Sequence, residues 1–260
     1  MQEENKTLKS KIEEMESKTN TLISENEKLK KENFDLVIAF GGYTSRLAKI
    51  TYFLKSKYSV GMGSNKFLFD LFYDKAVIQN KTKFKSQIEE MSTLIKAARL
   101  NIPKNLPYTN FELLNRPNRK WLAICPDVKR EESQYPINFY GEIIKKVLNE
   151  NKFTRVSFFL ADRRSPYTKL RDYGAKYIQT NNLRELITTL SKYGSVLTAE
   201  GGSAHIAGAL GLSVFIISGT KNQSYWKPHA KKIKTFISPN SVNTINPNLI
   251  LKAIYSLQEK

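Results

Sequence analysis

From residue 120 to the end of the chain, short apolar runs alternate with longer amphipathic stretches. The apolar runs predict strands at residues 121–125, 156–160, 177–179, 195–197 and 214–217. The amphipathic stretches predict helices at residues 139–148, 166–173, 183–193 and 249–257. Strands that alternate with helices form right-handed βαβ units, and these build a parallel sheet covered by helices on both faces. Residues 120–260 are therefore predicted to form a Rossmann-like domain.

A shorter alternation of the same kind occupies residues 34–105. The pattern predicts, in order, strand 35–40, helix 45–55, strand 58–60 and helix 83–100. We predict a partial N-terminal Rossmann-like domain from this pattern. Residues 106–119 hold Pro107 and Pro117 among mostly polar neighbours, which is typical of a linker between domains. The predicted fold class is thus α/β with two Rossmann-like parallel-sheet domains.

Residues 1–33 are almost wholly polar and contain neither glycine nor proline. An apolar side chain recurs there every seven residues, at Leu8, Met15, Leu22 and Leu29. The second position of each heptad is mostly polar, at Asn5, Ile12, Thr19 and Asn26. This pattern predicts a long helix that pairs as a parallel coiled coil, and hence a homodimer through residues 1–33. The alternative is a single solvated helix whose thin apolar stripe packs against the following domain.

The composition narrows the class of protein. Of the 260 residues 40% are hydrophobic, which is enough for a core and argues against wholesale disorder. The single cysteine, Cys125, excludes an intramolecular disulfide and fits a reducing compartment. No apolar run approaches the roughly 20 residues that a membrane-spanning helix needs, and the start lacks a signal-peptide pattern. We expect a cytoplasmic protein.

The formal net charge of +18 predicts attraction to polyanions. The lysines are spread along the chain and do not gather with aromatic residues in a nucleic-acid-binding motif, so no specific nucleic-acid partner is expected. Two interpretations stay open. The charge is either a generally solvated basic surface, or it attracts an anionic membrane or a lipid-linked acceptor at the inner membrane.

The densest candidate chemistry lies at the turn between the predicted strands 195–197 and 214–217. Gly201 and Gly202 let a ligand approach the backbone, and the N–H groups of a helix beginning at Gly202 or Ser203 attract phosphate. Ser203 either caps the helix or donates a hydrogen bond to a phosphate oxygen. Glu200 is placed to accept hydrogen bonds from ribose or sugar hydroxyls, and His205 to touch a pyrophosphate. These residues predict a phosphate-containing ligand.

A second small-residue turn, residues 218–221, ends the next predicted strand and carries the hydroxyl of Thr220 beside a lysine. Two such neighbouring loops make a cradle for a nucleoside diphosphate. The spacing matches neither a Walker loop nor the G-x-G-x-x-G dinucleotide pattern. Ser203 does not stand in a G-x-S-x-G nucleophile elbow. With only two histidines and one cysteine, no structural zinc site is predicted.

Residues 200–211, EGGSAHIAGALG, together with the following strand and the Gly219-Thr220 turn, resemble the signature of the bacterial heptosyltransferase family. Trp226-Lys-Pro228 and Ile237-Ser-Pro239 fall where that family has a Trp-x-Pro and a Ser-Pro element. The resemblance implies a GT-B architecture, in which two Rossmann-like domains face each other across a cleft. It also implies inverting, metal-independent transfer of a heptose-like sugar from a nucleotide diphosphate donor, such as ADP-heptose, to lipopolysaccharide or another surface glycan.

By the same resemblance, Glu200 contacts the donor's ribose or sugar. Gly202, Ser203 and His205 lie along its diphosphate, with Thr220 nearby. The chain departs from the family in having Glu200 where an aspartate is usual and Ser133 where a phosphate-binding lysine is usual. It also lacks the opening strand and Gly-Asp loop whose aspartate is the family's general base, so no catalytic residue is assigned. The alternative function is a non-catalytic donor-site or scaffold protein that keeps the fold.

Overall fold

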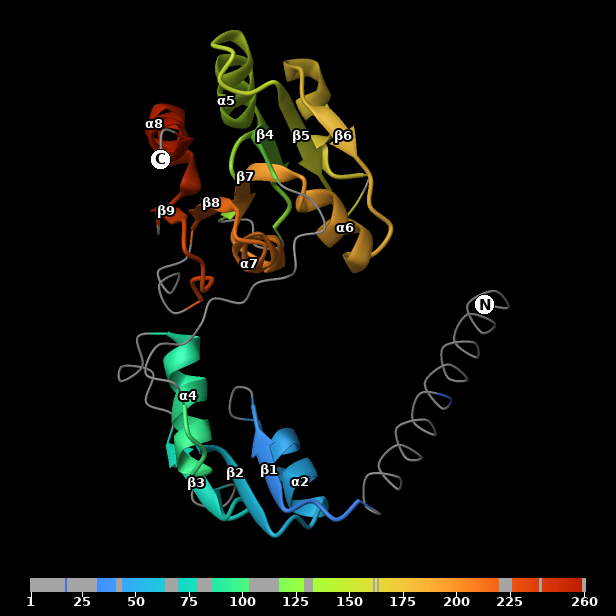
Figure 1. The fold of residues 1–260 in the computed structure, drawn as a ribbon, viewed down its shortest axis with the longest axis vertical. Helices are drawn as coiled ribbons and strands as arrows, with labels where there is room; N and C mark the ends of the chain where they lie inside the picture. The colour runs from blue at the N-terminus through green and yellow to red at the C-terminus, as the bar shows by residue number, and fades with distance from the viewer. Residues whose placement is uncertain are drawn as a thin grey trace, which may run out of the picture. The chain divides into compact units, whose positions relative to one another are not determined.

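The computed structural model describes residues 32–40, 44–63, 70–78, 86–102, 117–128, 133–160, 162, 164–219, 226–238 and 240–258, together with Ser17. The chain divides into two compact units, residues 1–104 and 105–260 (Figure 1). The predicted coiled coil at residues 1–33 lies almost entirely outside the described residues. Within the described part of the chain, no helix is both long and apolar enough to cross a membrane.

The first unit contains a three-stranded parallel sheet in the order β1-β2-β3. Its strands are β1 (Leu36–Ala39), β2 (Tyr58–Gly63) and β3 (Lys75–Ile78), and its helices are α2 (Ser45–Phe53) and α4 (Gln87–Ala97). Each helix begins at a capping hydroxyl, because Thr44 Oγ1 accepts the N–H of Leu47 and Ser86 Oγ accepts the N–H of Glu89, both at 3.2 Å. Strand β3 is not among the sequence predictions.

The second unit is a six-stranded parallel sheet in the order β6-β5-β4-β7-β8-β9. The strands are β4 (Asn118–Cys125), β5 (Arg155–Phe159), β6 (Lys176–Ile178), β7 (Tyr193–Ala199), β8 (Ser213–Ser218) and β9 (Ile233–Ile237). The helices are α5 (Ile137–Asn149), α6 (Leu183–Leu190), α7 (Gly202–Ala209) and α8 (Pro247–Gln258), with 3₁₀ turns η2 (Pro166–Tyr173) and η3 (Val242–Thr244). The order of strands and helices agrees with the predicted parallel α/β domain.

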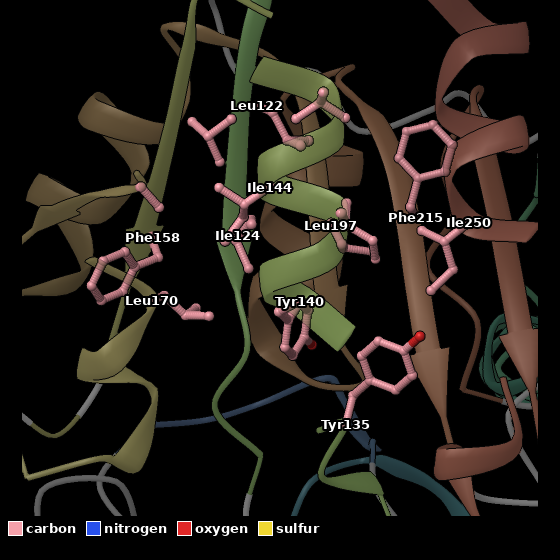
Figure 2. Close-up of a cluster of buried hydrophobic side chains, with 14 of the residues drawn as sticks. Leu122, Ile124, Tyr135, Tyr140, Ile144, Phe158, Leu170, Leu197, Phe215 and Ile250 are labelled. Carbon is pink, nitrogen blue, oxygen red and sulfur yellow. The ribbon is translucent and has the colours of Figure 1, made fainter. Parts of the chain in front are cut away.

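Helices cover both faces of this sheet because alternate strand residues point to opposite sides. Leu122 and Ile124 of β4 join the core formed with α5, η2 and α8, as Figure 2 shows for the side chains around Ile144 and Ile250. Ala123 and Cys125 of the same strand join the opposite core, which α6 and α7 complete. Burial on both sides explains why the central strands are continuous apolar runs in the sequence.

Three local predictions require adjustment. The helix predicted at 183–193 ends at Leu190, and Tyr193 is the first residue of β7. Tyr193 is buried there and its ring packs edge-on against Phe159, which favours the strand over a continued helix. Strand β4 begins at Asn118, inside the segment expected to be a linker. Strand β9 was not predicted, since its five residues alternate between exposed and half-buried positions.

Candidate functional site

The candidate site lies where the central strands of the second unit end. Strands β4, β7 and β8 are neighbours and parallel, so their carboxyl ends meet at one edge of the sheet. Open α/β sheets bind ligands at this edge. The loops that follow these strands bring together Ser133, the Glu200–Gly202 turn and Gly219, and these are the residues from which the site is built.

The turn between β7 and α7 leaves open space in front of the helix. Gly201 has φ +152° and ψ −165°, a conformation that favours glycine. A Cβ added at Gly201 or at Gly202 would meet no atom within 4 Å. The first backbone N–H groups of a helix have no partner inside the helix and carry its positive dipole end. An anion therefore has direct access to the backbone at the start of α7.

Ser203 does not cap this helix, which corrects one of its two predicted roles. Helix α7 begins at Gly202, so Gly201 occupies the N-cap position and no side chain caps it. Ser203 is two residues past the N-cap, and its Oγ lies 2.8 Å from Thr198 Oγ1. The other predicted role, a contact with phosphate, stays a prediction. Ser203 lines the cleft described below.

Glu200 is held by two serine hydroxyls from neighbouring segments. Ser133 Oγ donates a hydrogen bond to Glu200 Oε1 at 3.1 Å, and Ser218 Oγ donates to Glu200 Oε2. Ser133 Oγ also accepts the backbone N–H of Gly219 at 3.1 Å. Both serine side chains are fully buried, whereas Glu200 is half-buried. The carboxylate thus ties together the ends of β7 and β8 and the segment before α5.

Sequence reasoning treated Ser133 only as a departure from the heptosyltransferase pattern. In the structure it is a link between Glu200 and the backbone of Gly219. The available signal was weak, because a single serine 67 positions from Glu200 has no pattern that marks it. Because Ser133 is buried and its Oγ is hydrogen-bonded to Glu200 and to Gly219, it does not face solvent as a phosphate ligand would. Its role here is to position Glu200 and the start of the loop after β8.

His205 lies in the first turns of α7 and is exposed. Desolvation by the surrounding protein lowers the pKa of its imidazole below the usual 6.5. The ring is therefore neutral at pH 7 when no anion is bound. The five predicted residues from Glu200 to His205 lie together at this turn. Thr220, the sixth, lies outside the described residues, although Gly219 before it is described.

A cleft of about 410 Å³ adjoins the turn. It is lined by Cys125, Asp127, Phe159, Leu160, Thr180, Asn181, Asn182, Leu183, Leu186, Gly201, Gly202 and Ser203. Apolar walls with a few polar groups at the rim are typical of small-molecule sites of this size. The sequence did not indicate this cleft, because its walls come from the ends of four separate strands and the start of α6.

Two side chains in the cleft are limited in the chemistry they offer. Burial raises the pKa of the Cys125 thiol to about 12, so it is not a nucleophile near neutral pH. Asp127 Oδ1 accepts a hydrogen bond from Ser165 Oγ at 2.7 Å. Among the described residues, no three metal-ligating side chains gather at one place. The cleft therefore offers a ligand hydrogen-bonding groups at its rim, such as Thr180 and Asn181, beside the open start of α7.

The family model described as glycosyltransferase family 9 (heptosyltransferase) matches residues 23–246. The Escherichia coli heptosyltransferase WaaC, solved with ADP, is 18% identical, with a TM-score of 0.70 over 89% of this chain and 75% of that one. A family 9 glycosyl transferase from Veillonella parvula is 12% identical, with a TM-score of 0.73 over 90% and 77% of the two chains. No curated protein matches by sequence. These solved structures share the α/β fold with parallel sheets.

Proposed function

The chain belongs to glycosyltransferase family 9, the heptosyltransferases, and on that premise we propose which reaction it performs. It transfers a heptose-like sugar, with inversion and without a metal, from a nucleoside diphosphate donor to a lipopolysaccharide or another surface-glycan acceptor. The observation that carries this proposal is the open start of α7 beside the carboxylate of Glu200 and the cleft. Together these offer separate places for the diphosphate, the sugar or ribose, and the nucleobase of a donor.

The donor is an ADP-sugar in this proposal. WaaC was solved with ADP and with ADP-2-deoxy-2-fluoro heptose, and it shares the fold of this chain. The diphosphate lies against the N–H groups of Gly202 and Ser203, with His205 beside it. Glu200 accepts hydrogen bonds from donor hydroxyls, and Thr220 lies near the diphosphate. As the bond between the sugar and the diphosphate breaks, the backbone N–H groups at the start of α7 stabilise the negative charge that develops on the departing diphosphate.

A second candidate function is donor binding without transfer. It is favoured by one specific observation, namely that Ser133 is buried where the heptosyltransferase pattern has a phosphate-binding lysine. The catalytic base is also unassigned among the described residues. Dimerisation through residues 1–33 and contact with an anionic membrane remain further predictions that accompany either function.

Calorimetric titration with ADP-heptose tests donor binding, and release of ADP in the presence of acceptor tests transfer. Transferase function predicts saturable binding of ADP-heptose in preference to UDP- and GDP-sugars, followed by ADP release when lipopolysaccharide core is added. Binding without ADP release on any acceptor supports the second candidate. No binding at millimolar ADP-heptose contradicts both.

The affinity for ADP-heptose is expected to rise as the pH falls from 7.5 to 5.5. The pKa of His205 is lowered in the free protein, so the imidazole is neutral at pH 7. A bound diphosphate favours the imidazolium, so binding takes up a proton and strengthens as the pH falls through the region below 6.5. The diphosphate of a sugar nucleotide is a diester whose own charge does not change over this range.

We expect a gain of about twofold to fivefold, which is the size of one exposed charge interaction. Calorimetry at each pH measures it. The matched control is His205→Gln, which keeps a hydrogen-bonding side chain but should flatten the pH profile. An equally steep profile in His205→Gln would show that another group is responsible.

A further inference from the structure

The first unit exposes a cluster of aromatic side chains at the end of α2. Tyr52 and Phe53 are each 57% exposed, and Leu71 is 63% exposed. The ring of Tyr52 packs edge-on against Phe53 at a centroid distance of 5.8 Å and against Phe72 at 5.3 Å. Single exposed apolar residues are common on proteins, but a contiguous group marks an interaction surface. We call Tyr52, Phe53 and Phe72, together with Leu71, the aromatic cluster.

The cluster is fixed to the rest of the first unit. Phe72 is half-buried and packs against the small core formed by Ala39, Ala48 and Tyr73. The Tyr73 ring in turn lies over Gly61, where an added Cβ would come within 2.2 Å of it. Tyr52 is held between Phe72 and Phe53. The exposed rings are therefore presented by a rigid base.

Positive charge shares the outer face of α2 with these rings. Arg46, Lys49, Ile50 and Phe53 follow one another at helical spacing and are all exposed, while Ala48 and Thr51 face the core. Helix α2, which lies against β1 and β2 in Figure 1, contains no acidic residue. The surface is thus both basic and aromatic.

We propose that this face of α2, with the aromatic cluster, docks on an anionic lipid bilayer. Tyrosine and phenylalanine rings favour the boundary between head groups and acyl chains, and arginine and lysine are attracted to acidic head groups. The chain's net charge of +18 complements such a surface. That such a bilayer would hold a lipid-linked acceptor rests on the proposed function, whereas the docking surface does not.

Two other occupants fit less well. Nucleic acid is bound by phosphate contacts and base stacking along a basic groove, whereas these rings stand on a convex helix face. A second copy pairing through this face would place Arg46 and Lys49 opposite their own counterparts or close to them, and like charges repel there. A bilayer surface satisfies both the apolar and the basic side chains at once.

Vesicle sedimentation of the full chain tests the proposal. The probe is a vesicle of equal parts phosphatidylglycerol and phosphatidylcholine, compared with pure phosphatidylcholine. Tyr52→Ser/Phe53→Ser is expected to lower the partition constant about 30-fold, because two half-exposed rings lose their burial in lipid. Arg46→Gln/Lys49→Gln is expected to lower it about 25-fold on the anionic vesicles, at about fivefold for each charge. Arg46→Gln/Lys49→Gln changes exposed side chains outside the packed rings, so this variant keeps the test valid if the aromatic variant fails to fold.

The matched control is Leu249→Ser/Lys252→Gln, which removes an exposed apolar residue and an exposed cation from α8 in the other unit. It should bind vesicles as the unchanged chain does. Vesicle binding that is equally strong in all three variants overturns the proposal. The proposal is also overturned if Tyr52→Ser/Phe53→Ser lowers the oligomeric state or the binding to a DNA oligonucleotide but leaves vesicle binding intact.

Calorimetry with ADP-heptose separates this proposal from the proposed function. The α2 variants should bind ADP-heptose as the unchanged chain does, since the candidate donor site belongs to the other unit. If the unchanged chain binds anionic vesicles through α2 but does not bind ADP-heptose, the donor assignment fails and the docking surface stands. If it binds ADP-heptose but not the vesicles, the docking surface fails alone.

Discussion

Replacing Gly202 with aspartate is expected to lower the affinity for ADP-heptose about 1000-fold without destabilising the protein. The added carboxylate would stand at the start of α7, where a Cβ meets no atom within 4 Å. It would occupy the position proposed for the donor diphosphate. Two unit charges about 4 Å apart repel by about 4 kcal/mol in a partly solvated site, which corresponds to this loss.

The fold should tolerate this change well. An acidic residue in the first turn interacts favourably with the helix dipole, and glycine is a poor helix former. The free energy of unfolding should therefore stay the same or rise by up to about 1 kcal/mol. Calorimetry and chemical denaturation measure the two effects separately. Gly202→Asn is the neutral control of the same shape and should lose much less affinity; equal losses in the two variants would contradict the charge argument.

Glu200→Ala is expected to weaken ADP-heptose binding about 100-fold and also to destabilise the protein. The carboxylate accepts hydrogen bonds from Ser133 and Ser218, whose side chains are fully buried. Buried hydroxyls that lose their acceptor cost about 1–3 kcal/mol of folding free energy. Hydrogen bonds from donor hydroxyls to a charged acceptor contribute about 1.5–3 kcal/mol, and these would be lost as well.

A double-mutant cycle separates the positioning role of Ser133 from its own packing. The free energies of unfolding of Ser133→Ala, Glu200→Ala and the double variant should be non-additive, with a coupling of about 0.5–3 kcal/mol. Ser191→Ala is the matched control, since Ser191, which follows α6, is buried and its Oγ donates a hydrogen bond to the carbonyl oxygen of Thr188. Its effect on the free energy of unfolding should be additive with that of Glu200→Ala. Strict additivity would mean that Ser133 does not hold Glu200.

The parallel α/β fold could be predicted because its central strands are buried on both faces. Residues 214–217 are a continuous apolar run and residues 195–197 contain Val196 and Leu197, and both segments lie inside observed strands, β8 and β7. The strands that were missed, β3 and β9, lie at sheet edges. Their exposed residues, such as Lys75 and Lys234, interrupt the apolar pattern. The edge strands β1 and β6 were predicted, so the interrupted apolar pattern, and not edge position by itself, is the reason that β3 and β9 were missed.

The sequence predicted the site from two contiguous segments, the turn at residues 200–205 and the turn at residues 218–221. Glu200 to His205 form one turn, so glycine, acid and histidine could be recognised together. Ser133 and the cleft residue Asp127 reach the site from the loop after β4, and Ser218, at the end of β8, supports Glu200. They meet because β7 lies between β4 and β8, and chain order alone does not specify that β4 and β7 are neighbours. The heptosyltransferase resemblance supplied the ligand class but not these supports.

The central claim is that a sugar nucleotide binds at the start of α7, and backbone amide hydrogen exchange tests it most directly. Exchange would be followed with and without saturating ADP-heptose. The account predicts slower exchange in the segment from Glu200 to His205 and at the cleft residues Thr180 to Leu183, with the other unit unchanged. Binding of ADP-heptose that leaves exchange at Gly202 and Ser203 unchanged, or that protects a different segment of the chain, would contradict it.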